Sequence, residues 1–235
     1  MRMPHFFLLF LLLPFFALTQ RTSLDLVSGL ELSYRSLHAN DVSTVISIRS
    51  AEEARLSTRF GFNFNYRLSE RVWLKTGLRL VNIGYQSTRE GLIFASDIDL
   101  LSSIVDPANL PNVLKHEYIY QYVEVPFGVR YTSKPKKWQS FIEVGIAPHI
   151  FQALSMKWTT DSEPKPGRRN ITDQDFAKIN WATYAAFGVQ YACSQDIQLF
   201  VQPSFRYYWT KTMMNTPVQE RLFSGGLELG LRKML

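Results

Sequence analysis

Between residues 56 and 68 the chain alternates between apolar and polar side chains. The even positions are Leu, Thr, Phe, Phe, Phe, Tyr and Leu, and the odd positions are Ser, Arg, Gly, Asn, Asn and Arg. Successive side chains of a β-strand point to opposite faces, so this segment predicts a strand with one apolar and one charged face. A soluble sandwich would bury the apolar face under a second sheet. A transmembrane barrel would turn it to lipid and point the polar face into its lumen.

The same alternation recurs along the chain and yields eight strand candidates. Each is long enough for the roughly 9–11 tilted residues of a membrane strand. The strands are expected near 24–37, 54–68, 71–86, 117–132, 138–156, 179–193, 196–210 and 219–234. The pattern therefore favours an all-β fold, namely an eight-stranded antiparallel up-and-down transmembrane barrel over residues 20–235.

The connections between these strands alternate in length. Short turns are expected at 69–70, 133–137 and 194–195, and longer polar links at 38–54, 88–116, 157–178 and 211–218. Short periplasmic turns that alternate with long external loops are typical of outer-membrane barrels, and a sandwich has no reason to sort its loops in this way. We therefore predict a location in the bacterial outer membrane, with both termini in the periplasm.

The N-terminus predicts export. Arg2, the apolar run from Phe6 to Phe16 and the sequence Ala17-Leu18-Thr19 form a signal-peptide pattern, so we expect residues 1–19 to be removed. The alternative is an uncleaved N-terminal anchor, although the apolar run is shorter than the about 20 residues of a membrane helix. No later apolar run reaches that length, which excludes a helical membrane protein. Cys193 is the single cysteine, so no disulfide within the chain is expected.

Aromatic side chains gather near both ends of the expected strands. Amphipathic rings favour the headgroup levels of a membrane, so two aromatic girdles are expected of a membrane barrel. The predicted girdle residues are Tyr66, Tyr131, Trp138 and Tyr191 beside the short turns, and Tyr34, Trp158, Trp181 and Trp209 near the long loops. Strands are rich in aromatic residues in any fold, but their placement at both ends favours the barrel.

One hairpin carries a family resemblance. Residues 122–131 (YVEVPFGVRY), the Lys-Pro-Lys-Lys turn and residues 141–145 (FIEVG) resemble the central hairpin of the PorT-like outer-membrane β-barrel family. The motif covers this hairpin, and the layout is similar over most of the chain. The resemblance implies a small eight-stranded barrel like the OmpA membrane domain, with a role in secretion or envelope integrity. Such barrels often end in an aromatic residue, whereas this chain ends in Leu235.

The polar faces place many charged side chains inside the expected barrel. Eight-stranded barrels have interiors just wide enough for side chains to fill, and a buried charge is costly unless it is paired. We therefore predict an ion-pair network that plugs the lumen. Its predicted members are Glu31, Arg59, Arg79, Glu124, Arg130, Glu143, Arg206, Glu228 and Arg232. Arg35, Arg67 and Lys75 are expected on the same faces. The alternative is a small polar pore or ligand site, or an acid/base pair of Glu124 and Glu143.

An enzymatic barrel would gather Ser, His and an acid near its outer rim. His149, Ser155 and Glu143 share the lumenal face by parity, but a hydrogen-bonded structural histidine is the simpler interpretation, so we expect no enzyme. His38 and His116 lie in no ligand-like cluster, and we expect no metal and no other cofactor. The net charge of +6 comes from scattered Lys and Arg residues, which indicates no nucleic-acid partner.

The segment 91–114 is rich in Leu, Ile and Phe, which is unusual for an external loop. It could be a cap that packs on itself or a surface that contacts a partner. We expect a monomer in outer-membrane lipid that contacts other envelope or secretion proteins through loop 88–116. The sequence thus predicts a structural or interaction role. The alternative is a narrow small-solute pore or ligand-binding barrel, and an enzyme that acts on lipid or peptide comes third.

Overall fold

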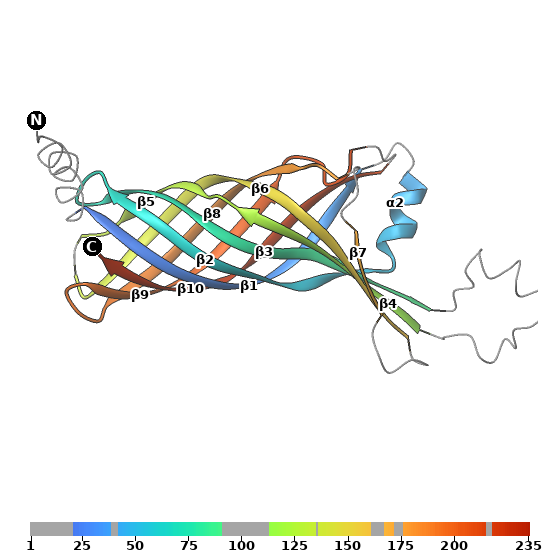
Figure 1. The fold of residues 1–235 in the computed structure, drawn as a ribbon, viewed down its shortest axis with the longest axis horizontal. Coiled ribbons are helices and arrows are strands. Elements are labelled where there is room, and N and C mark those ends of the chain that lie inside the picture. The colour runs from blue at the N-terminus through green and yellow to red at the C-terminus, as the bar shows by residue number, and fades with distance from the viewer. Residues whose placement is uncertain are drawn as a thin grey trace, which may run out of the picture.

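The computed structural model describes residues 21–38, 42–90, 113–134, 136–160, 167–171, 176–214 and 218–235. It confirms the predicted fold class, because eight antiparallel strands follow one another around a closed ring (Figure 1). The expected signal peptide lies outside the described residues, and so do most of loop 88–116 and parts of loop 157–178. In the ranges given above, no helix is long and apolar enough to cross a membrane.

Each expected strand range overlaps an observed strand. The strands are β1 (Thr22–His38), β2 (Glu52–Arg67), β3 (Val72–Glu90), β4 (Val113–Glu124), β5 (Phe127–Thr132), β6 (Trp138–Thr160), β8 (Ile179–Ala192), β9 (Ile197–Tyr208) and β10 (Gln219–Met234). A short strand β7 (Gly167–Ile171) pairs with the outer end of β6, and helix α2 (Val42–Arg49) lies between β1 and β2.

Strands β4 and β5 together form one interrupted strand of the barrel. They are interrupted at Val125 and Pro126, where proline has no N–H group for the ladder. The Val125 N–H donates instead to the carbonyl of Pro148 on β6 at 3.0 Å. Counting β4 and β5 as one and setting β7 aside, the ring has the eight strands that the alternation predicts.

The first and last strands close the ring. β1 and β10 pair without interruption from Ser23 opposite Met234 to His38 opposite Gln219. Beyond this ladder the Leu235 N–H donates to the carbonyl of Thr22 at 3.0 Å. A closed ring leaves no strand edge unpaired, which is the condition for β-structure to cross a membrane.

The apolar stripe of β2 faces outward. Phe60, Phe62 and Phe64 are 54%, 47% and 41% exposed, although they are large and apolar. Their companions on the neighbouring strands, such as Leu30 and Leu78, are also exposed. A soluble sandwich would bury these side chains, so the stripe is the lipid-facing belt of a membrane barrel.

Several strands continue beyond this belt at the end opposite to the termini. β3 reaches Glu90 and β4 begins at Val113, so the predicted loop 88–116 shortens to residues 91–112. β6 contains 23 residues, about twice the number that a membrane strand needs. Figure 1 shows β3 and β4 reaching farther than the other strands at this end. These extensions lack the apolar alternation because lipid does not contact them.

A β-bulge changes which side chains of β6 face inward. The register between β4 and β6 shifts between Gln121 and Tyr122. As a result, Leu154 rather than Ser155 packs beside Tyr120 in the interior. Ile150, before the bulge, is exposed, so even-numbered side chains of β6 face outward there. After the bulge they face inward, and Trp158 lies opposite His116 on the inward-facing side. The structure therefore does not place Trp158 in the predicted girdle.

The other predicted girdle residues lie at the two ends of the belt. At the end with the short turns, which the sequence predicts to be periplasmic, Trp138 and Tyr191 contact each other with ring centres 4.7 Å apart, and Tyr66 and Tyr131 lie beside the short turns. At the outer end, Trp181 and Trp209 contact at 6.4 Å. Tyr34 packs edge-on against Phe223 at 5.9 Å on the outer part of β1.

Candidate functional site

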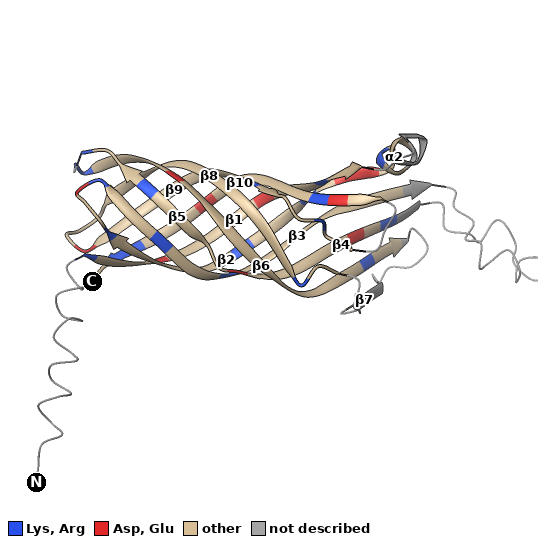
Figure 2. Ribbon diagram, turned by 90° about the horizontal axis from the view of Figure 1, so that it is seen from above, with Lys and Arg blue, Asp and Glu red and all other residues tan. Residues whose placement is uncertain are grey.

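The candidate site is the charged interior of the barrel. All nine residues of the predicted network lie inside, and none is more than 3% exposed. Figure 2 shows acidic and basic positions along the strands of the barrel. Direct ion pairs do not join all nine residues, although Gln202 bridges Arg130 and Glu228 by accepting from the first at 3.3 Å and donating to the second at 2.7 Å. The nine residues divide into a central cluster and a periplasmic cluster, and a further cluster of charged residues lies toward the outer end.

The central cluster contains equal numbers of arginines and glutamates, namely Arg59, Arg79, Arg206, Glu31, Glu124 and Glu228. The Arg59 Nε lies 2.9 Å from the Glu124 Oε2, and the Arg79 Nη1 lies 3.2 Å from the Glu124 Oε1. The Arg206 Nη2 lies 2.5 Å from the Glu228 Oε1. These side chains come from β1, β2, β3, β4, β9 and β10, so the cluster ties most of the barrel together.

His149 completes the central cluster. Its Nε2 lies 3.1 Å from the Glu124 Oε2 and 3.0 Å from the Tyr208 hydroxyl, and its Nδ1 lies 3.0 Å from the Ala147 carbonyl. The ring is fully buried, and both nitrogens have protein partners. Ser155 is out of phase with His149 because of the bulge. Ser155 and His149 are thus not brought together on one inward-facing row of β6, in the part of the chain that the structure describes.

The periplasmic cluster is built around Glu143. The Lys75 ammonium pairs with one oxygen of this carboxylate, and the Arg130 Nη2 lies 2.7 Å from the other. Glu143 and Glu124 therefore belong to different clusters and do not form an acid/base pair. Close by, Arg232 makes a two-pronged contact with Asp25, at 2.7 and 2.9 Å.

Lys75 was expected on the inward face but not as a member of the predicted network, and Asp25 was not predicted at all. Both had a usable sequence signal, since Asp25 has the parity of Glu31 on the first strand and Lys75 has the parity of Arg79 on the third. The Arg130 guanidinium also stacks on Phe141, with its central carbon 4.2 Å from the ring centre. Such contacts favour arginine over lysine at this position.

The pairing in the outer cluster was not predicted, although Arg35 was expected on the inward face. Arg35 pairs with both Glu52 and Glu220, and its guanidinium lies 3.8 Å from the ring centre of Tyr85. Glu52 precedes the expected start of its strand, which hid its role. In the part of the interior that the structure describes, the three clusters hold seven cationic and seven anionic side chains. The interior is therefore neutral overall.

An apolar and aromatic layer separates the central and outer clusters. Its buried members are Val81, Ile83, Tyr85, Tyr120, Tyr122, Leu154, Phe176, Ala182, Tyr208 and Leu222. Tyr122 packs against both Tyr120 and Tyr208, with ring centres 6.4 Å apart in each case. This layer packs above the charges, so a solute that passed between these residues would have to displace packed rings as well as ion pairs.

Within the described ranges, no group of three or more His, Cys, Asp or Glu side chains could hold a metal ion. Cys193 is a free, exposed cysteine in the turn between β8 and β9.

Known proteins share this architecture. The family model of the outer membrane protein beta-barrel domain matches residues 22–210, which include every barrel strand except β10. The chain belongs to this family. As an outer membrane beta-barrel domain, it lies in the bacterial outer membrane with its apolar belt in contact with lipid.

Solved outer-membrane barrels are similar to this family member over most of its length. Neisserial surface protein A is 9% identical, with 91% of this chain and 97% of that chain covered and a TM-score of 0.48. OprG from Pseudomonas aeruginosa is 10% identical, with 92% and 98% covered and a TM-score of 0.49. The outer membrane protease OmpT from Escherichia coli is 7% identical, with 92% and 97% covered and a TM-score of 0.45. No curated protein matches the sequence.

Proposed function

We propose that this outer-membrane barrel conducts no solute and catalyses no reaction, and that it acts through its extracellular end. In this role it supports envelope integrity or assists secretion by contacting other envelope proteins. The observation that carries the proposal is the filled interior. A neutral set of seven cations and seven anions is packed below a layer of buried rings.

The energetics of the interior disfavour transport. Removing one partner of a buried ion pair typically costs about 3–5 kcal/mol because the other charge stays unpaired. A solute that entered the central cluster would have to separate several such pairs, including those of Arg59 and Arg79 with Glu124. This cost supports a structural role for the charges rather than a permeation path.

The extended strands support an extracellular role. β3, β4 and β6 continue past the lipid-facing belt, and β7 pairs with the end of β6. β3 ends at Glu90 and β4 begins at Val113, on either side of the segment 91–112. In the proposed role, this segment contacts partner proteins, as the sequence predicts for loop 88–116.

Membership in the PorT-like group is part of the same proposal. The hairpin that carries the resemblance supplies three interior charges, Glu124, Arg130 and Glu143. Arg130 and Glu143 pair with each other across β5 and β6. The resemblance thus rests on residues that build the filled interior, which supports a shared non-conducting design.

Planar-bilayer recordings test the proposal. The purified mature barrel should give no discrete current steps under conditions in which a porin, prepared in the same way, gives regular openings. Reproducible single-channel openings by the wild-type chain would contradict the proposal and favour the narrow-pore alternative.

The interaction role needs a separate test. Residues 91–112 would be replaced by a short Gly-Ser linker, which leaves β3 and β4 in place. The variant should still reach the outer membrane and shift its gel mobility on boiling. Crosslinks to neighbouring envelope proteins should be lost. Unchanged crosslinks in a correctly inserted variant would remove this segment from the proposal.

A further inference from the structure

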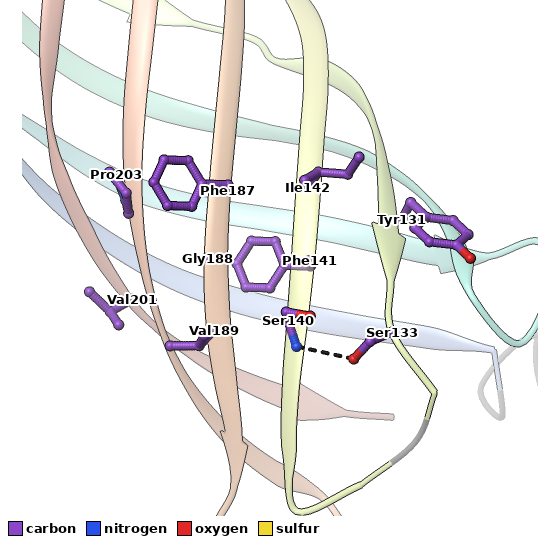
Figure 3. A pocket seen from close by; sticks show the side chains of 10 residues that line it. All are labelled: Tyr131, Ser133, Ser140, Phe141, Ile142, Phe187, Gly188, Val189, Val201 and Pro203. Carbon is purple, nitrogen blue, oxygen red and sulfur yellow. Dashed lines mark hydrogen bonds between the residues drawn. The ribbon is translucent and has the colours of Figure 1, made fainter.

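The lipid-facing surface has a groove beside the hairpin that joins β5 to β6. Its volume is about 510 Å³, and it crosses β5, β6, β8 and β9 (Figure 3). Its apolar lining is formed by Ile142, Phe187, Val189, Val201 and Pro203. Ser140 also faces it and is exposed, and its small side chain leaves space beside Val189, its partner on β8. This apolar lining suits a hydrocarbon chain.

The periplasmic end of this groove is polar. The hydroxyls of Tyr131, Ser133 and Ser140 lie there, and the Arg71 Nη1 donates to the Tyr131 hydroxyl at 3.2 Å. The Ser140 N–H donates to the Ser133 hydroxyl at 3.1 Å (Figure 3). Hydroxyl groups at this depth can hydrogen-bond to the ester region of a lipid. The groove therefore changes from apolar to hydrogen-bonding along its length.

Cationic side chains lie directly beyond the hydroxyls. The turn between β5 and β6 carries Lys134, Lys136 and Lys137, and all three are exposed. The Lys137 ammonium lies 5.3 Å from the ring centre of Tyr191. A hydrogen bond with the Tyr191 hydroxyl raises the pKa of Lys137, so this ammonium stays charged at neutral pH.

The whole periplasmic rim shares this positive charge (Figure 2). Among the described residues at this rim, seven are cationic and two, Glu70 and Asp196, are anionic. The cations are Arg21, Arg67, Arg71, Lys134, Lys136, Lys137 and Lys233. Because the described interior is neutral, much of the chain's excess charge of +6 lies at this rim. An anionic ligand complements it.

We propose that this groove binds an anionic diacyl phospholipid of the periplasmic leaflet. One acyl chain lies along the apolar lining between Ile142 and Val201, and the phosphate faces the lysines of the β5–β6 turn. Basic residues next to a membrane surface attract anionic lipid with roughly 1 kcal/mol each, which is roughly a 5-fold effect per lysine. The apolar groove selects where on the barrel the lipid lies, and the charge selects which headgroup is held.

Native mass spectrometry of the mature barrel in detergent tests this site. Dioleoyl phosphatidylglycerol and dioleoyl phosphatidylethanolamine, which share acyl chains, are titrated separately. The wild-type barrel should retain phosphatidylglycerol preferentially. The double variant Lys134→Gln/Lys136→Gln should weaken its retention roughly 25-fold, from about 5-fold per lysine. The double variant Lys178→Gln/Lys211→Gln removes the same charge at the outer end and should leave retention unchanged.

A second pair of variants tests the groove itself. Ser140→Phe adds an outward-facing ring that fills the groove and should reduce phosphatidylglycerol retention at unchanged charge. Ser28→Phe makes the same substitution in a neighbouring lipid-facing groove next to Phe60 and should not. Gel mobility before and after boiling verifies that every variant is folded. The proposal is overturned by equal retention of both lipids, by equal loss in the outer-end lysine variant, or by equal effects of Ser140→Phe and Ser28→Phe.

Discussion

At the scale of single residues, Glu124 has the most demanding position in the barrel. Its carboxylate is fully buried and contacts the side chains of Arg59, Arg79 and His149 at 2.9, 3.2 and 3.1 Å, respectively. Each of these partners comes from a different strand. Loss of the charge would therefore remove contacts with three strands of the barrel at once.

The variant Glu124→Gln tests this position. The amide cannot neutralise Arg59 or Arg79, so we expect the free energy of unfolding to fall by about 3–5 kcal/mol. Urea unfolding of the barrel in lipid vesicles, followed by tryptophan fluorescence, measures the change. Glu70→Gln in the exposed β2–β3 turn is the control and should stay within about 0.5 kcal/mol of wild type. Equal stabilities of the two variants would show that the central ion pairs are dispensable.

Parity along the strands was enough to predict which charges face inward, but not which of them meet. Glu124 and Glu143 look equivalent in the sequence, yet one joins Arg59 and Arg79 and the other joins Lys75 and Arg130. The pairing depends on strand register and on the tilt of the barrel. Neither can be read from alternation within a single strand.

At the scale of strands, prediction succeeded where lipid imposes the pattern. The stripe of Phe60, Phe62 and Phe64 lies on β2 with the expected outward face. Prediction failed past the belt, where β6 continues to Thr160 without an apolar face to mark it. It also missed the bulge at Gln152 of β6, opposite Gln121 and Tyr122, because an extra residue in one strand reverses the parity of everything that follows.

Two adjacent glycines on β10 provide a matched test of strand packing. A Cβ on Gly226, which faces inward, would lie 2.5 Å from the Glu31 Cα and would also meet the Leu30 carbonyl. A Cβ on Gly225 would have no neighbour closer than 3.8 Å. Gly226→Ala should therefore cost about 1–3 kcal/mol of unfolding free energy, as overpacking does. Gly225→Ala should cost less than about 0.5 kcal/mol.

The same urea titration measures both glycine variants. A similar loss for the two would mean that backbone flexibility, rather than close approach of β1 and β10, explains the glycines. Other inward glycines face rings instead of charges. Gly145, for example, leaves room for Tyr184, whose ring would lie 2.7 Å from an added Cβ. The sequence does not show which ring lies opposite a given glycine.

At the scale of the whole molecule, charge is sorted by location. The described interior is balanced, and the periplasmic rim carries far more cations than anions. The cations at this rim, next to the membrane surface, therefore account for most of the net charge of +6. Composition alone does not distinguish these locations, since the same total could be spread evenly over a soluble surface.

Because β1 and β10 pair with each other, the chain termini could be moved to another turn without changing which strands are neighbours in the ring. Thr22 and Leu235 are hydrogen-bonded neighbours, so a short linker could join them.

A circular permutant that begins at Gln195 and ends at Ser194 should refold from urea into detergent and shift its mobility on boiling. A permutant opened within β9, between Val201 and Gln202, should not. If both fail, the native termini are needed for the barrel to form. If the first succeeds, any of the three periplasmic turns could serve as the start of this protein, and a binding module could be attached there without disturbing the extracellular face.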